Sequence, residues 1–118
     1  MEEKQIDIIV RKLYAIADLA HITHANIRVG FHHEATGEFY ASVIDLKDRI
    51  VEHLMGSGKL IRVNANILEI GEDLIKEASN FQYMLDTYAS QSGCNALINM
   101  SGDYIEALSK LKLKFMMS

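Results

Sequence analysis

Several residue types are absent or scarce in this chain, and each absence excludes a class of protein. The 118 residues include no Pro, no Trp and a single Cys, Cys94. Because Pro is the strongest terminator of helices, its absence permits long uninterrupted helices. One Cys cannot form an intramolecular disulfide framework, and its isolation fits a reducing compartment.

The chain also lacks a basic excess and long apolar runs. Twelve Lys and Arg face 16 Asp and Glu, which gives a net charge of −4. This balance, and an N-terminus without a Lys-rich arm, argue against general nucleic-acid binding. The charged opening MEEKQIDIIV is neither a signal peptide nor a membrane span. We therefore expect one domain over residues 1–118, cytoplasmic and without membrane contact.

Four segments carry apolar residues at three- and four-residue spacing, which predicts amphipathic helices. They cover residues 5–22, 35–54, 71–88 and 97–115. The predicted fold is all-α, a four-helix bundle.

The connections differ in character. Residues 26–30 form a tight link, so the first two helices should pack as an antiparallel hairpin. Residues 90–93 are typical of a turn. Between residues 60 and 68 the apolar positions Ile61, Val63, Ala65 and Ile67 alternate with polar ones. This period of two predicts an extended crossover between the second and third helices, with an irregular helix start as the alternative.

The expected second helix carries five carboxylates that fall within roughly 80° of one another. They lie opposite its apolar stripe, and either form a solvated acidic face or include metal ligands. Asp48 and Glu52 are four residues apart and could chelate one cation. The five residues are Glu34, Glu38, Asp45, Asp48 and Glu52.

All five His residues lie between His21 and His53. His21 and His24 fall near the end of the first helix and His33 lies just after the turn, so these three could gather. Imidazole with carboxylate suits iron, zinc or manganese, and iron is favoured where coordination positions stay open. His33 and Asp48 are about 22 Å apart along one helix, so a shared ion needs a second, antiparallel copy.

The second-helix residues His33, Glu34, Tyr40, Asp48 and Glu52 form the pattern H-E-x5-Y-x7-D-x3-E. This pattern resembles the signature of the Dps miniferritins of the ferritin-like superfamily. The resemblance implies a ferritin-like bundle with an iron-oxidising centre across a dimer interface. It implies that His33 with His24 or His21 of one subunit faces Asp48 and Glu52 of the other.

Residues 21–56 are more similar still to an uncharacterised family of bacteriophage and large-virus proteins that shares the Dps-like core. Its pattern H-x6-Y-x4-D-x2-D-x3-E-x3-G fits from His33 to Gly56 without a gap. Two positions depart from the Dps pattern: Gly37 replaces a further carboxylate ligand, and Ala25 replaces the Trp after the first-helix His. For a phage protein the compartment would be the host-cell cytoplasm.

Two hypotheses of function follow. The first is a Dps-related oligomer, at least a dimer, that binds Fe, or Mn or Zn, through His33, Asp48, Glu52 and a first-helix histidine, His24 or His21. It would have ferroxidase activity and no organic cofactor. The second is a non-enzymatic phage accessory protein that binds a small ligand or a host protein. We interpret His32 as structural or exposed, His53 as support for a helix C-terminus, and Cys94 as an ordinary buried thiol.

Overall fold

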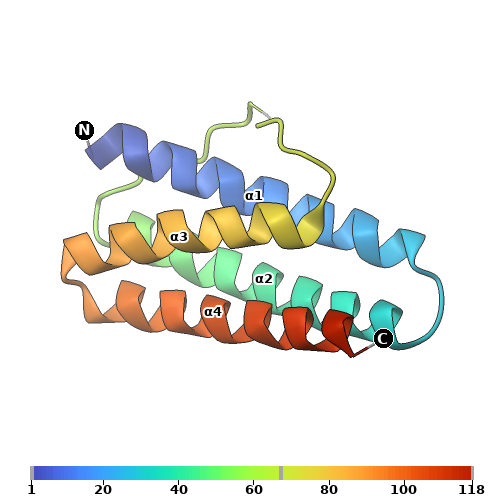
Figure 1. Cartoon of the computed structure of the whole chain (residues 1–118). Helices are drawn as coiled ribbons and strands as arrows, with labels where there is room; N and C mark the ends of the chain where they lie inside the picture. The colour runs from blue at the N-terminus through green and yellow to red at the C-terminus, as the bar shows by residue number, and fades with distance from the viewer. Residues whose placement is uncertain (1, 67, 118) are drawn as a thin grey trace.

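The computed structural model describes residues 2–66 and 68–117, and their regular structure is entirely helical. The helices are α1 (Glu2–Asn26), α2 (Phe31–Gly56), α3 (Leu74–Ser92) and α4 (Asn95–Met116) (Figure 1). The predicted all-α four-helix bundle is confirmed. No helix in the described part of the chain is long and apolar enough to span a bilayer.

The helix ends differ from the predicted ones. α1 and α2 are longer than their apolar stripes, because their outer turns also contain polar residues. α3 begins only at Leu74, where the Asp73 side chain caps the helix by accepting a hydrogen bond from the Lys76 N–H at 3.2 Å. The predicted turn at 90–93 was too long: the helix continues to Ser92 and ends at Gly93, whose φ of 65° is left-handed.

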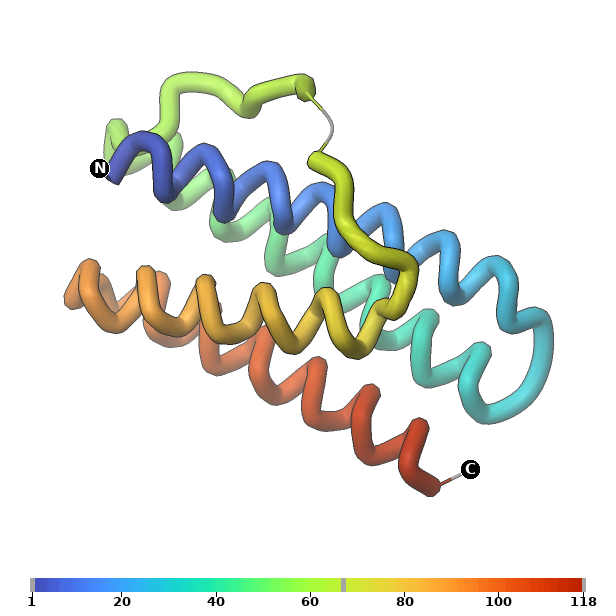
Figure 2. The backbone as a smooth tube through the Cα atoms, turned by 45° about the horizontal axis from the view of Figure 1, so that its top comes forward, coloured from blue at the N-terminus to red at the C-terminus, as the bar shows by residue number. Residues whose placement is uncertain are grey.

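The topology is that of a bundle with one long crossover. α1 and α2 form the predicted antiparallel hairpin, and the chain then returns along the length of the bundle, so that α2 and α3 run in the same direction (Figures 1 and 2). α1 packs on α2 and α3, while α4 packs on the same two helices. All four packed pairs are antiparallel, and the single long crossover connects the hairpin of α1 and α2 to the hairpin of α3 and α4.

The crossover is extended, as predicted, and its described residues 57–66 and 68–73 form no helix. Its alternating apolar residues do not share a buried face. Ile61 is 94% exposed, whereas Val63 packs partly against the core. Ile67, which belongs to the same alternation, lies outside the described residues.

The bundle interior is almost wholly apolar. Among the described residues the only buried polar side chains besides tyrosines are Thr36 and Ser101. Tyr104 is fully buried and donates a hydrogen bond to the carbonyl of Ala78 at 2.7 Å. Burial raises the pKa of Tyr104 far above its usual range. The described interior therefore contains no imidazole or carboxylate that could bind a metal. A metal site in this protein would have to be formed by side chains at the surface.

We expect Leu108→Ala to lower the free energy of unfolding by about 2–5 kcal/mol, because the substitution leaves a cavity among the packed helices. Leu108 is 0% exposed, whereas Leu113 on the same helix is 57% exposed. Leu113→Ala should therefore change stability by less than about 0.5 kcal/mol. Urea unfolding followed by circular dichroism measures both. If the two variants lose the same free energy of unfolding, then Leu108 does not pack among the helices as the structure shows.

Candidate metal centre at the hairpin end

Two histidines meet where α1 turns into α2. His24 lies in the last turn of α1 and His33 in the first turn of α2, and only residues 27–30 separate the two helices. The connection is short because Gly30 adopts a φ of 85°, which favours glycine. The two imidazole rings stack with their centroids 4.0 Å apart. The sequence expectation that His24 and His33 lie together is confirmed.

Hydrogen bonds to backbone carbonyls indicate which nitrogen of each ring is the donor. His24 Nδ1 lies 2.9 Å from the carbonyl oxygen of His33, and His33 Nδ1 bonds the carbonyl oxygen of Ile27. A carbonyl oxygen can only accept, so each Nδ1 must carry the proton. In the neutral rings each Nε2 therefore holds a lone pair. This is the arrangement in which a backbone carbonyl orients a metal-binding histidine.

Gly37 makes room for this pair. A Cβ atom at Gly37 would lie 2.9 Å from Cε1 and 3.2 Å from Nδ1 of His24. The His24 ring thus packs directly over the backbone of α2, where any side chain would displace it. The departure from the Dps pattern at this position has a physical reason in this chain: a carboxylate at residue 37 and the observed His24 position exclude each other.

His21 does not join the pair. Its ring stacks on Tyr40 with the centroids 4.8 Å apart, one turn further along the hairpin. Of the three histidines expected to gather, the structure brings two into contact, and His21 lies beside them with a partner of its own.

The carboxylates of α2 divide into two groups. Glu38 accepts a hydrogen bond from Lys114 at 2.8 Å, which holds the pKa of Glu38 below its usual range. Asp45 lies 3.5 Å from Arg49. Glu34, Asp48 and Glu52, in contrast, are exposed and have no ion pair or side-chain hydrogen bond within the described residues. The two carboxylates predicted as ligands are thus ones that the chain itself leaves without a cation.

The histidine pair and these carboxylates are far apart in one chain. α2 is a continuous helix from Phe31 to Gly56, so His33 and Asp48 are separated by about 22 Å. In keeping with this, no three His, Cys, Asp or Glu side chains within residues 2–66 and 68–117 are close enough to hold a metal ion. One chain supplies two ring nitrogens at one end of the hairpin and two carboxylates toward the other.

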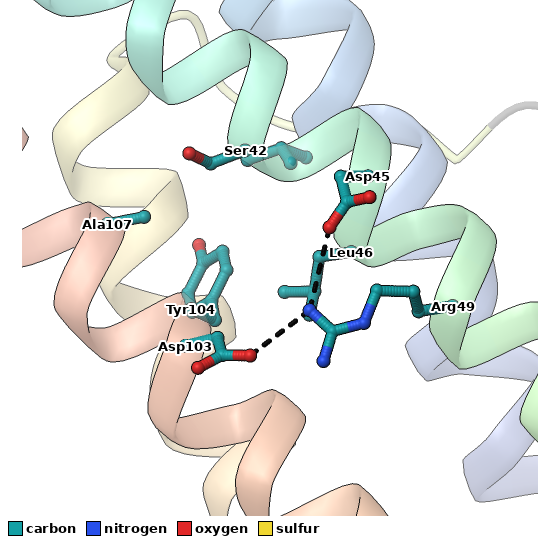
Figure 3. Close-up of a pocket in the computed structure, with 8 residues that line it drawn as sticks. Ser42, Asp45, Leu46, Arg49, Asp103, Tyr104 and Ala107 are labelled. Carbon is teal, nitrogen blue, oxygen red and sulfur yellow. Dashed lines mark hydrogen bonds and ion pairs between the residues drawn. The ribbon is translucent and has the colours of Figure 1, made fainter.

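A separate small cavity of about 140 Å³ lies between α2 and α4. Arg49 Nη1 is 3.5 Å from Asp45 and 3.1 Å from Asp103, so its guanidinium lies between the two carboxylates (Figure 3). Because the arginine already neutralises these acids, a metal cation gains little there. The cluster instead links α2 to α4 across their seam.

The remaining histidines have structural contacts. His32 stacks on Phe115 near the end of α4, with the ring centroids 4.1 Å apart. His53 lies in the last turn of α2, as predicted, but its Nε2 is 3.4 Å from Cys94 Sγ. The interpretation of Cys94 as an ordinary buried thiol was therefore wrong: it is half-buried and has an imidazole partner. The two residues are 41 positions apart, so spacing gave no signal of this contact.

Comparisons with protein-family models, curated proteins and solved structures found no match to this chain.

We expect Gly37→Ala to cost stability although it replaces glycine within a helix. Such a change normally stabilises by roughly 0.5–1 kcal/mol, and Gly102→Ala should do so, because no atom lies within 4 Å of its added Cβ. At Gly37 the contact with His24 should cancel this gain and leave the variant about 1 kcal/mol or more below Gly102→Ala.

A double-mutant cycle tests the cause. In a His24→Ala background the clash is removed, so Gly37→Ala should become stabilising. Urea unfolding measures all four proteins. If Gly37→Ala stabilises the chain whether or not His24 is present, then His24 does not pack over Gly37.

Proposed function

We propose that this protein is a Dps-related, ferritin-like metal-binding protein that holds ferrous iron between two copies of the chain. His24 and His33 of one copy provide Nε2 ligands, and Asp48 and Glu52 of the second copy provide oxygen ligands. The observation that carries the proposal is the pair of imidazoles whose Nδ1 protons are both held by backbone carbonyls. Manganese and zinc suit the same donors.

The ligand positions favour a two-fold dimer. The histidine pair lies at the start of α2, and the unpaired carboxylates lie about 15 residues later on the same helix. If a second α2 packs antiparallel on the first, each histidine pair faces the other copy's carboxylates. Two-fold symmetry then produces two equivalent sites.

Charge supports the same arrangement. Two neutral imidazoles and two carboxylates balance a divalent cation. Without a cation, bringing Asp48 and Glu52 against a second copy would remove two carboxylates from water unpaired, which is costly. The metal would therefore stabilise the dimer, and the dimer would complete the metal site.

Iron oxidation is the reaction that this ligand set suits. Four protein donors leave coordination positions open on Fe²⁺, which generally prefers more than four ligands. Conversion of Fe²⁺ to Fe³⁺ releases one electron, which dioxygen or hydrogen peroxide would accept. The iron would be the substrate, and no organic cofactor is required.

Alanine at either paired histidine should weaken Fe²⁺ binding by about 100-fold, since each loses one direct ligand. Anaerobic calorimetry measures the affinity, and the absorbance of Fe³⁺ after admission of air measures the oxidation. Tyr83→Ala is the control, because this side chain is 78% exposed and lies on α3, which supplies none of the proposed ligands. Unchanged binding in both His24→Ala and His33→Ala would overturn the proposal.

Mixing two inactive variants tests the shared site directly. The double variant His24→Ala/His33→Ala lacks nitrogen donors, and Asp48→Asn/Glu52→Gln lacks oxygen donors. When they are unfolded together and refolded in equal amounts, half of the dimers should be mixed. Each mixed dimer should contain one intact site out of two, so about a quarter of the wild-type metal capacity should return.

The mixing experiment also has a clear negative result. If the sites lie within single chains, no combination of the two variants regains capacity. If the carboxylates are not ligands, Asp48→Asn/Glu52→Gln binds iron on its own. Either outcome rejects the intersubunit site, and mass photometry or sedimentation of each sample verifies that dimers formed.

A further inference from the structure

A groove with a volume of about 640 Å³ follows the C-terminal half of α1 and continues to Ile27 in the connection to α2. Its apolar lining includes Leu19 and Ile22 from α1 and Leu68 and Ile70 from the crossover. Ile22 and His24 are two positions apart, which places them about 200° apart around the helix. Neither His24 nor His33 lines the groove, although Ile27, whose carbonyl oxygen bonds His33 Nδ1, does. The groove and the proposed metal centre are therefore different sites that meet at Ile27.

The groove exists because the helices differ in length. α1 has 25 residues, whereas α3, which packs beside it, has only 19. The hairpin end of α1 extends past the beginning of α3, and the crossover passes across α1 before it reaches α3 (Figures 1 and 2). As a result Ile22 is 55% exposed.

The charged residues that line this groove are all acidic. Asp18 and Glu72 line it, both are exposed, and neither forms an ion pair within the described residues. No Lys or Arg is among its described lining residues. Elsewhere on α1 a similar acid is neutralised: Arg11 lies 3.6 Å from Asp7. The groove thus combines an apolar lining with two carboxylates that lack a cation.

We propose that this groove binds a small organic cation with an apolar body. Its ammonium group is attracted by Asp18 and Glu72, and its hydrocarbon part contacts Leu19 and Ile22. The volume falls within the range of about 300–1,000 Å³ that small-molecule sites occupy. A neutral molecule of the same shape lacks the charge attraction, and an anion is repelled. The site does not depend on the metal proposal.

Octylammonium, octanol and octanoate provide a matched series of probes. We expect octylammonium to bind at least fivefold more tightly than octanol, and octanoate to bind more weakly than both. Asp18→Asn/Glu72→Gln should reduce the preference for octylammonium over octanol about fivefold. Glu3→Gln/Glu106→Gln, which removes the same charge elsewhere, should preserve it. Calorimetry measures affinity, and amide chemical shifts locate the probe.

The apolar part is tested by a second pair of variants. Ile22→Ser should weaken both octylammonium and octanol, whereas Ile61→Ser, at a residue that is 94% exposed on another part of the crossover, should weaken neither. His24→Ala should leave octylammonium binding intact, so failure of the metal centre and failure of the groove can be distinguished.

Three results would overturn the inference: equal binding of octylammonium and octanoate, chemical shifts confined to another region, or equal effects of the two serine variants. A fourth would assign the groove to a second copy of the chain. In that case Ile22→Ser would dissociate an oligomer in sedimentation experiments, and no probe would bind.

Discussion

The close approach of α1 and α2 at their short connection is the constraint on which the histidine centre depends. The two imidazoles are part of the turn itself: His33 binds the carbonyl of Ile27, and His24 binds the carbonyl of His33. Gly37 lets the His24 ring approach the backbone of α2. The interactions that close the hairpin are therefore the same ones that fix the tautomers and directions of the candidate ligands.

The crossover imposes a second constraint, because it must span the bundle before α3 can begin. α3 is consequently shorter than the hairpin helices, and the end of the hairpin extends beyond it. The histidine pair lies at this end of the hairpin, and the groove beside Ile22 reaches the same end. The short connection between α1 and α2 thus positions residues of both candidate sites.

The fold could be predicted from the sequence because helix packing leaves a local signal. Leu74, Ala78, Phe81 and Leu85 recur at helical spacing, and all four are buried. The pairing of His24 with His33 could be predicted because a short turn joins their helices. The contact between His53 and Cys94 could not, since it joins helices that are far apart in sequence. The role of Gly37 could not either, because a missing side chain gives no indication of what packs against it.

The histidine pair could serve the turn alone, since both Nδ1 atoms stabilise it. The carboxylates of α2 favour a metal-binding role in addition. Two acids of α2 form ion pairs. Glu38 pairs with Lys114 of α4, and Asp45 pairs with Arg49 of α2 itself. Asp48 and Glu52, like Glu34, have no cation within the described residues, although they fall within about 80° of the paired acids around α2. A structural turn explains the histidines alone, whereas the proposed site between two copies would also give Asp48 and Glu52 a cation.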